Sequence, residues 1–319
     1  MRTLRFHEYG EPADVLRLET ADAPEPRAGH IRVRVHACGL NPADWALCRG
    51  LFAGDLPRGV GLDVAGTVDA VGEGVTTIGV GDRALGSASF SGYPSAGASD
   101  SAVLERWCQA PDGLDLIKAA ALPMAVETAS LHLDALGPSP GQTVLIHAAG
   151  TMMGFAAVQM ALMRGARVIA TAGDTFAGQL RALGASVTSY GDGMVGRVRE
   201  IPGGAPDLIL DTASPNGVLP DLIKIAGGDP RRVLTMTDFA SAAELGARHS
   251  FGETMTRRED VLAEFAKLAA EVQFTIPIAR RFRLDDWREA LDASLSGHAH
   301  GKLMLLPEGP ADEVKGTSQ

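Results

Sequence analysis

The chain has 319 residues, of which 45% are hydrophobic and 21% charged, a composition typical of a folded protein large enough for two domains. Its 39 acidic and 29 basic residues give a net charge of −10, which repels phosphate backbones, so nucleic-acid binding is not expected. Three cysteines are too few for a disulfide framework. No signal-peptide core and no apolar run of membrane-spanning length is found, which predicts a cytoplasmic protein without a membrane partner.

The first part of the chain is predicted to be rich in β-structure. Residues 31–39 alternate apolar and polar side chains, as a half-buried strand does. Residues 61–86 contain short β-branched runs separated by glycine, which predicts a compact, antiparallel, barrel-like unit. Residues 87–101 are small and polar and predict a flexible loop.

From about residue 117, helical periods alternate with short apolar runs. Strands are expected at 143–149, 166–173, 185–190, 207–213 and 231–236, with helices at 154–165, 177–185 and 218–227. This alternation with short connections predicts right-handed crossovers and a parallel sheet. Beyond it we expect an amphipathic helix at 259–271, a strand at 274–282, a helix at 284–297 whose core face is Leu284, Trp287 and Leu291, a closing strand at 301–307 and a loose polar tail at 308–319.

The segment with the most chemical information is HAAGTMMG, residues 147–154, which follows an expected strand and opens an expected helix. In a βαβ unit, a dinucleotide pyrophosphate binds at this turn, on the amides of the helix N-terminus. Gly154 provides close packing of helix on strand, and Thr151 stands where a glycine normally lets the backbone approach the pyrophosphate. Taken alone, the segment also fits a tight turn that binds no ligand.

Several motifs together resemble the zinc-independent quinone oxidoreductases, the zeta-crystallin-like branch of the medium-chain dehydrogenase/reductases. They are residues 141–150 with Gly154 and Gln159, the NPxD segment at 41–44, the barrel signature at 61–68, and Gly301 with Lys302. The resemblance covers nearly the whole chain. It implies an α/β fold with an N-terminal GroES-like β-barrel domain, residues 1–122 and 255–319, plus a Rossmann domain with a doubly wound parallel sheet, residues 123–254.

The same resemblance implies the site residues. Asn41 is expected near the nicotinamide, in the cleft between the domains, or else as a cap of its own loop. Asp44 either orients that loop or caps a helix beginning near Trp45. The predicted catalytic residues are Asn41 and Asp44, and the predicted cofactor-binding residues are Thr128, Gly150, Thr151, Met152, Met153, Gly173, Tyr190, Met236, Phe251 and Lys302. For Lys302, a solvated position on the closing strand is the alternative.

Two departures from the family pattern concern the cofactor. The family's double glycine is Thr151 and Met152 here, and Ala177 stands where the family often offers a lysine to the 2′-phosphate of NADP. Asp174 could bond a ribose 2′-hydroxyl, which favours NAD, or could be a solvated aspartate. The resemblance therefore predicts NADP(H) as the cofactor, with NAD(H) not excluded.

No metal is expected. Zinc-dependent relatives need a cysteine at the position of Asn41 and a GHE motif where this chain has residues 61–63. Asn41 and Leu62 do not supply the ligands that a catalytic zinc requires. Without a Lewis acid, the acceptor must already be activated, as in a quinone, an enone or an enoyl thioester.

The predicted function is therefore a zinc-free, NADP(H)-dependent reduction of an activated C=C or C=O bond in a small-molecule substrate. Two alternatives stay open: a cofactor-poor family member that binds a ligand or regulates, which the altered loop at Thr151 suggests, and a non-redox biosynthetic enzyme on the same fold. A homodimer is also expected, because nucleotide domains of this family often pair edge strands, here near residues 248–251.

Overall fold

The computed structural model describes residues 1–89, 92–201 and 205–309. It divides into two compact units, unit 1 with Met1–Met124 and Leu262–Gln319, and unit 2 with Ala125–Val261. The resemblance places the domain boundaries at 122/123 and 254/255, whereas the two units meet at 124/125 and 261/262. Residues 90–91 of the expected loop and 310–319 of the expected tail lie outside the described residues.

Unit 1 is built on the predicted β-barrel. A six-stranded sheet runs in the order β14-β15-β3-β5-β6-β7, and a further pairing of β3 with β7 closes the last four strands on themselves. The strands are β3 (Ile31–Leu40), β5 (Asp63–Val71), β6 (Arg83–Ala88), β7 (Ser101–Gln109), β14 (Ile278–Arg283) and β15 (Lys302–Leu306). Only β14 and β15 pair in parallel within this sheet as described. A smaller sheet, β2-β1-β4, comprises β1 (Arg2–Phe6), β2 (Arg17–Thr20) and β4 (Arg58–Gly59).

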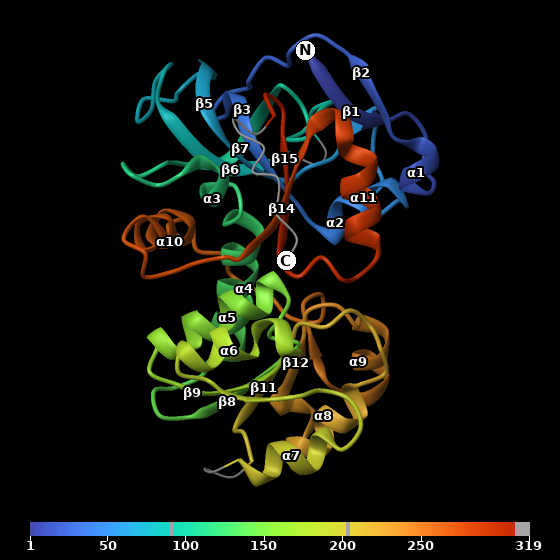
Figure 1. The fold of residues 1–319 in the computed structure, drawn as a ribbon, viewed down its shortest axis with the longest axis vertical. Coiled ribbons are helices and arrows are strands. Elements are labelled where there is room, and N and C mark those ends of the chain that lie inside the picture. The colour runs from blue at the N-terminus through green and yellow to red at the C-terminus, as the bar shows by residue number, and fades with distance from the viewer. Residues whose placement is uncertain (90–91, 202–204, 310–319) are drawn as a thin grey trace, which may run out of the picture. The chain divides into compact units, whose positions relative to one another are not determined.

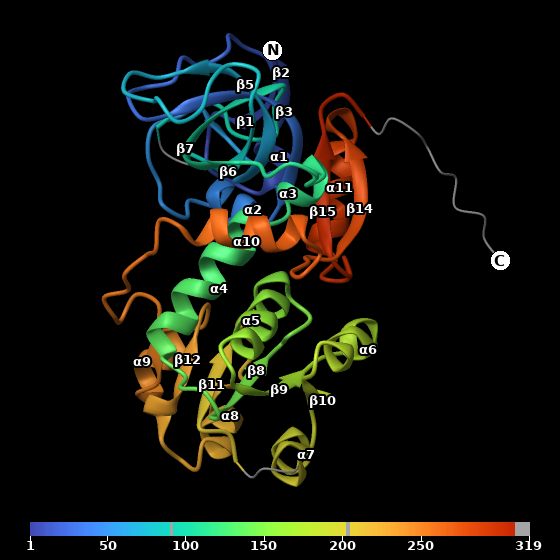
Figure 2. The ribbon, with the colours of Figure 1, turned by 90° about the vertical axis from the view of Figure 1, so that its left-hand side faces the viewer.

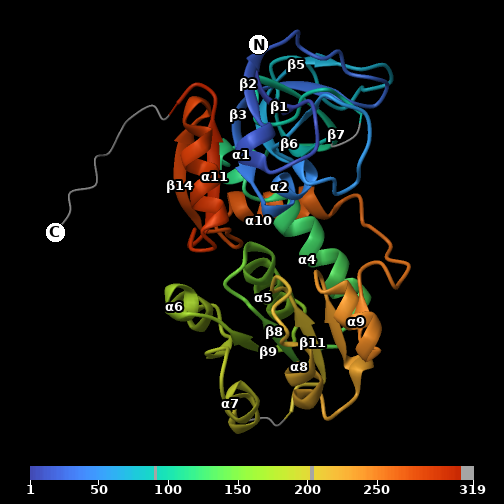
Figure 3. The ribbon, with the colours of Figure 1, turned by 90° about the vertical axis from the view of Figure 1, so that its right-hand side faces the viewer.

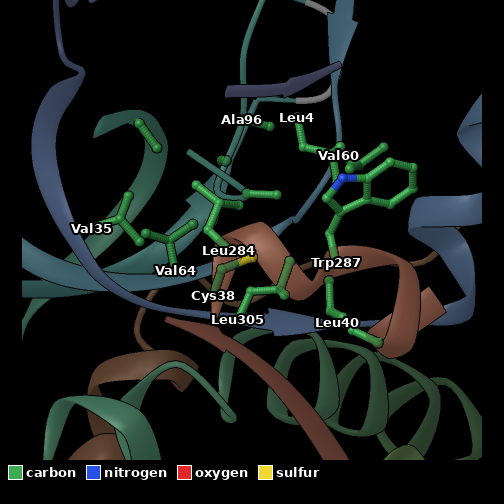
Figure 4. Close-up of a cluster of buried hydrophobic side chains, with 14 of the residues drawn as sticks. Leu4, Val35, Cys38, Leu40, Val60, Val64, Ala96, Leu284, Trp287 and Leu305 are labelled. Atoms are coloured by element: carbon green, nitrogen blue, oxygen red, sulfur yellow. The ribbon is translucent and has the colours of Figure 1, made fainter. Parts of the chain in front are cut away.

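The core of unit 1 joins the barrel to the C-terminal segment. Ile31, Val33 and Val35 of β3 are buried in alternation with polar neighbours, which confirms the period-2 prediction. Figure 4 shows Trp287 and Leu305 in one apolar cluster with residues of the barrel strands. The predicted core face is confirmed, since Leu284, Trp287 and Leu291 are all buried. They lie on a 3-10 turn at Leu284–Asp286 and on α11 (Trp287–Leu295).

The other helices of unit 1 are short. They are α1 (Pro12–Val15), α2 (Pro42–Cys48) and α3 (Leu116–Ala119). Two further helices begin at the unit boundaries, α4 (Pro123–Leu136), most of which belongs to unit 2, and α10 (Val261–Ala270), most of which belongs to unit 1. Trp45 on α2 is buried and donates from Nε1 to Ser294 Oγ on α11, 2.8 Å away, so it packs inside unit 1.

The loop expected at 87–101 is confirmed between β6 and β7 for the residues that are described, but its ends belong to these strands and many of its side chains are buried. Ala88 belongs to β6, and the small side chains of Ser95, Ala96, Ala98 and Ser99 are buried. Ala98 is held from both sides, because its amide donates to Val60 O and its carbonyl accepts from Leu4 N, each at 2.9 Å. Small residues are needed here because the segment passes between neighbouring strands. The run of small residues in the sequence therefore indicates close packing.

Unit 2 contains the predicted parallel sheet, in the order β10-β9-β8-β11-β12-β13 (Figure 1). Its strands are β8 (Thr143–His147), β9 (Arg167–Thr171), β10 (Ser186–Thr188), β11 (Leu208–Asp211), β12 (Val233–Thr235) and β13 (Arg248–His249), and every pairing among them is parallel. The strand order runs outward from β8 to β10 and then returns to run outward from β11 to β13. The order therefore reverses between β8 and β11, and such a reversal is where doubly wound sheets bind their ligands.

Helices cover both faces of this sheet. Figures 2 and 3 show α5 (Met152–Met163) and α8 (Leu219–Ile225) on opposite sides of β8. Side chains of α7 (Met194–Glu200), α8 and α9 (Phe239–Leu245) pack with β8, β9, β11 and β12 in one apolar cluster. The remaining helix, α6 (Asp174–Ala182), follows β9. Within the described parts of the chain, no helix has the length and apolar character needed to cross a membrane.

Candidate active site

Most of the predicted cofactor-binding residues of unit 2 follow strand ends. Residues 150–153 come after β8, Gly173 after β9, Tyr190 after β10, Met236 after β12, and Phe251 after β13. Because these strands are parallel, their carboxyl ends meet at one edge of the sheet. The residues that the resemblance implies therefore share one edge, the edge at which open α/β sheets bind ligands.

Thr151 is the N-cap of α5, and its hydroxyl is engaged inside the protein. Its oxygen accepts from Gly154 N at 3.0 Å and lies 2.9 Å from Thr212 Oγ1. Thr212 directs its own hydroxyl hydrogen at the carbonyls of His147 and Ala148, so the hydrogen between the two threonines comes from Thr151. Since Thr212 follows β11, this bond bridges the two strands between which the strand order reverses.

The first turn of α5 has backbone amides that do not donate within the helix. The first N–H groups of a helix have no acceptor within it. Gly154 N is capped by Thr151, and Phe155 N donates to Thr151 O, which leaves Met152 N and Met153 N pointing out of the helix end. A Cβ at Gly154 would lie only 2.7 Å from Ala148 O, so the close approach of helix and strand requires glycine. These features fit a pyrophosphate on the helix N-terminus.

His147 ends β8 beneath this loop. The side chain is buried, and its Nδ1 lies 2.8 Å from Thr171 Oγ1 at the end of β9. The same hydroxyl accepts from Ala148 N at 3.0 Å, so the two strand ends and the loop share one hydrogen-bond system. Burial lowers the pKa of the His147 imidazole to about 4, so the ring is neutral at physiological pH.

We expect this histidine to make the protein sensitive to acid. A histidine in the unfolded chain has a pKa near 6.5, so between that value and about 4 only the unfolded chain binds the proton, and stability falls as the pH falls. By pH 5, the free energy of unfolding should drop by about 2 kcal/mol from its value at pH 7.5. Urea denaturation across this range checks the loss, with His147→Gln as the control, whose pH profile should be flatter. Parallel profiles for the two proteins would show that His147 is not responsible.

The end of β9 places the residues expected around the adenosine ribose. Gly173 is the N-cap of α6, and Asp174, the first residue of that helix, is exposed. A Cβ at Gly173 would lie 3.5 Å from the Tyr190 hydroxyl, so the loop after β10 passes close to this helix start. The Tyr190 side chain is 58% exposed and is accessible to a ligand.

The remaining predicted residues of unit 2 differ in their surroundings. Met236 is buried, whereas Phe251 is 66% exposed and packs edge-on against Phe239. The side chain of Thr128 on α4 is half-buried, and its carbonyl accepts from His132 Nδ1 at 2.7 Å.

The imidazole of His132 links α4 to the segment that carries Phe251. Because a carbonyl can only accept, Nδ1 of His132 carries the hydrogen, and Nε2 accepts from Ser250 Oγ at 2.5 Å. Ser250, the residue before Phe251, is therefore hydrogen-bonded to α4, the helix on which Thr128 lies.

In unit 1, the structure brings Asn41 and Lys302 together with Asp63. Lys302 Nζ lies 2.6 Å from Asn41 Oδ1 and 2.6 Å from Asp63 Oδ2, and Asn41 Nδ2 donates to Asp63 Oδ2 at 3.0 Å. The exposed fractions are 8% for Asn41, 0% for Asp63 and 2% for Lys302. The alternative of a solvated Lys302 is therefore wrong, because closure of β15 onto β3 buries its ammonium against a carboxylate. A Cβ at Gly39 would lie 2.7 Å from Lys302 Cε, so the lysine stem fits only beside glycine.

Asp44 is buried and orients the loop, one of the two roles considered for it. One oxygen accepts from Asn41 N at 2.7 Å, as in half of a capping box, and the other accepts from Gly61 N and Leu62 N. The helix that it caps begins at Pro42, not near Trp45. Burial raises the pKa of Asp44 to about 7. Since both oxygens face backbone amides, Asp44 holds Asn41 in place, which is a structural contribution to the site.

Sequence reasoning missed the role of two residues. Asp63 was recognised only as part of the barrel signature, yet it meets both Asn41 and Lys302. Thr212 was expected inside the strand at 207–213, whereas β11 ends at Asp211, so Thr212 is the first residue after a strand next to β8. A polar residue at such a strand end is a candidate for contact with a ligand. Among the residues that the structure describes, no group of three or more His, Cys, Asp or Glu side chains has a metal-binding arrangement.

Comparison with known proteins gives the same fold. Residues 27–107 match the family described as alcohol dehydrogenase GroES-like domain, and residues 183–305 match the family described as zinc-binding dehydrogenase. The solved quinone oxidoreductase of Coxiella burnetii superimposes with a TM-score of 0.80 at 27% identity, covering 96% of this chain and 99% of that one.

Two curated relatives align over different lengths. Erythronolide synthase EryA2 of Saccharopolyspora erythraea is 34% identical over 305 residues, 91% of this chain and 8% of that protein. Quinone oxidoreductase of Sus scrofa is 37% identical over 179 residues, 54% of this chain and 53% of that protein. The chain thus spans a small part of the first relative and about half of the second. The matched domains, the relatives and the superposition show that the chain belongs to the medium-chain dehydrogenase/reductase family, with the quinone oxidoreductases.

Proposed function

We propose that the protein is a zinc-free oxidoreductase that uses NADP(H) to reduce an activated C=C or C=O bond in a small molecule such as a quinone, enone or enoyl thioester. The observation that supports it best is the start of α5, where Met152 N, Met153 N and the obligatory Gly154 form a pyrophosphate-binding turn at the reversal of strand order. Relatives named quinone oxidoreductase support the same reaction class.

When bound, the nicotinamide supplies the hydride, and the chain supplies binding and orientation. In this proposal, the amides after Thr151 hold the pyrophosphate, and Gly173 and Tyr190 receive the adenosine ribose. Asn41 offers an amide hydrogen to the acceptor oxygen, on which negative charge develops. Asp174 is exposed beside Gly173, and its charge would oppose a 2′-phosphate, so NAD(H) competes with NADP(H) in this proposal.

Absence of zinc follows in this proposal from the residues of unit 1. Asn41 and Leu62 do not provide a catalytic zinc set. The Lys302 ammonium lies 2.6 Å from the oxygens of both Asn41 and Asp63, so a cation already neutralises the acidic group there. Metal analysis of the purified protein after brief chelation tests this point, and stoichiometric zinc would contradict it.

Fluorescence titration with NADPH and NADH, followed by turnover assays with a quinone, an enone and an enoyl thioester, tests the reaction. We expect binding of at least one nucleotide and its oxidation by at least one acceptor. Failure of both nucleotides to bind at millimolar concentration would favour the ligand-binding alternative. Binding without turnover across the acceptors would favour the non-redox enzyme.

Thr151→Gly should change NADPH affinity by less than about tenfold, or ~1.4 kcal/mol. The Thr151 hydroxyl faces Gly154 N and Thr212, so its removal withdraws no donor aimed at a phosphate, and glycine is itself an acceptable N-cap. Calorimetric titration of both proteins measures the difference. If Thr151→Gly created binding where the unchanged protein has none, the loop would be a disabled site.

We also propose a homodimer that forms through unit 2. β13 is an edge strand of the parallel sheet, and the exposed Phe251 follows it. An unpaired edge strand next to an exposed aromatic residue favours association with another copy. Light scattering at micromolar concentration should give twice the chain mass, and Phe251→Ser should shift the protein towards the monomer. A monomeric unchanged protein would contradict the proposal.

A further inference from the structure

The side-chain amide of Asn41 lies between two opposite charges. Its oxygen faces the Lys302 ammonium at 2.6 Å, and its nitrogen faces the Asp63 carboxylate at 3.0 Å. An ammonium can only donate hydrogen bonds and an ionised carboxylate can only accept them. Rotation of the amide by half a turn would place NH₂ against the ammonium and oxygen against the carboxylate. The charges therefore permit one orientation of the amide.

Burial makes this restraint strong. The three side chains come from separate elements, with Asn41 between β3 and α2, Asp63 on β5 and Lys302 on β15, and all three are almost inaccessible to solvent. Hydrogen bonds between charged groups strengthen where water is excluded. The second oxygen of Asp63 accepts from Met124 N at 2.8 Å, at the start of α4, so this carboxylate cannot turn away from Asn41 without losing that bond.

The stability of the fold does not account for the arrangement. A buried ion pair is often no more stabilising than apolar side chains of similar volume. The pair does determine which atoms of Asn41 remain for a ligand, namely one N–H and one lone pair of the oxygen. Asn41 Nδ2 donates this second hydrogen to Gly39 O over 3.5 Å, at the limit of a hydrogen bond, so a better placed acceptor can replace Gly39 O at small cost.

We propose that Asp63 and Lys302 are positioning residues for hydride transfer, acting through Asn41 by fixing its amide so that its second N–H, bonded only weakly to Gly39 O, is available to an acceptor. This inference rests on the proposed function, in which Asn41 donates to the acceptor oxygen. Neither Asp63 nor Lys302 touches the reacting atoms. Their effect on the reaction is the orientation of a donor, and a loosely oriented donor loses much of its value in a transition state.

The double variant Asp63→Asn with Lys302→Met tests the inference, because it removes both charges together and leaves neither one buried alone. The amide introduced by Asp63→Asn still has an oxygen for Met124 N, whereas Asn41 loses both charged partners. We expect the variant to fold and to bind NADPH within about threefold of the unchanged protein, while kcat falls about 10- to 100-fold. The isotope effect with NADPH deuterated at the transferred position should rise, since hydride transfer becomes slower.

The matched control is Arg2→Met with Asp100→Asn, which removes a half-exposed ion pair of the same unit, 2.8 Å between its charged atoms. It also removes one positive and one negative charge, but from side chains that do not contact Asn41. The kcat of this control should therefore stay within about twofold of the unchanged protein. A folded Asp63→Asn, Lys302→Met variant with unchanged kcat and isotope effect would overturn the inference. So would losses of kcat and NADPH affinity in equal proportion, which indicate general damage.

A second measurement does not need turnover. The chain has two asparagines, Asn41 and Asn216, so selective ¹⁵N-asparagine labelling gives two side-chain amide pairs in an NMR spectrum. Asn216 is exposed and serves as the internal reference. We expect slow solvent exchange at Asn41 in the unchanged protein and faster exchange in the double variant. Equal exchange at both asparagines in the unchanged protein would overturn the inference, whereas absent turnover with a protected Asn41 amide would overturn only the proposed function.

Discussion

Lys302→Met should lower the free energy of unfolding by about 3–5 kcal/mol, because it leaves the Asp63 carboxylate buried without its cation. Asp63 is fully inaccessible, and its remaining partners, Met124 N and Asn41 Nδ2, are neutral donors. Neutral hydrogen bonds do not replace the ammonium 2.6 Å away. Urea denaturation of unit 1, followed by the fluorescence of its tryptophans, measures the loss.

Arg34→Met is the matched control, since Arg34 also pairs with a carboxylate in unit 1, that of Glu308, but on the surface. The two side chains of that pair are 60% and 64% exposed, so the loss should stay below about 1 kcal/mol. Adding Asp63→Asn to Lys302→Met should restore most of the stability. If Lys302→Met were no more harmful than Arg34→Met, the Asp63–Lys302 pair would not be held as the structure has it.

The parallel sheet of unit 2 was predictable because each strand is a short apolar run between polar turns, and the apolar period changes where α5 begins. Among the helices that escaped prediction, α7 and α9 did so for identifiable reasons. α7 contains Gly196 within seven residues, and glycine weakens a helical pattern. α9 is equally short and buries Ala242, so it lacks the large apolar side chains that make a period visible.

The turn from β8 into α5 was predictable from sequence because residues 147–154 are contiguous and their spacing determines the local geometry. The contact of Asn41 with Asp63 and Lys302 could not be predicted in the same way. Lys302 and Asp63 are 239 positions apart, and only the pairing of β15 with β3 beside β5 brings them together. The hydroxyl of Thr151 offers a similar case, since its partner Thr212 lies 61 residues away, just after the neighbouring strand β11. The spacing of residues along the sequence predicts local turns. Contacts between residues on distant strands can be predicted only when the order of strands in the sheet is known.

Asn41→Ala should reduce kcat about 10²- to 10³-fold, the loss seen when an enzyme loses one preorganised donor to a developing oxyanion. The substitution leaves Lys302 and Asp63 paired with each other, so no charge becomes isolated and the protein should fold. NADPH affinity should change little, because the proposed pyrophosphate-binding turn at α5 belongs to unit 2, and Asn41 to unit 1. The expected signature is therefore a fall in kcat with a nearly constant dissociation constant for NADPH.

Asn216→Ala is the matched control for Asn41→Ala, because it removes the other asparagine of the chain from an exposed position. Steady-state kinetics with the best acceptor, together with NADPH titration, should leave Asn216→Ala within about twofold of the unchanged protein. A kcat for Asn41→Ala within about threefold of the unchanged value, with NADPH binding intact, would show that the acceptor oxygen takes its hydrogen bond elsewhere. The search for another donor would then begin with Thr128 on α4, a predicted cofactor-binding residue whose side chain is half-buried.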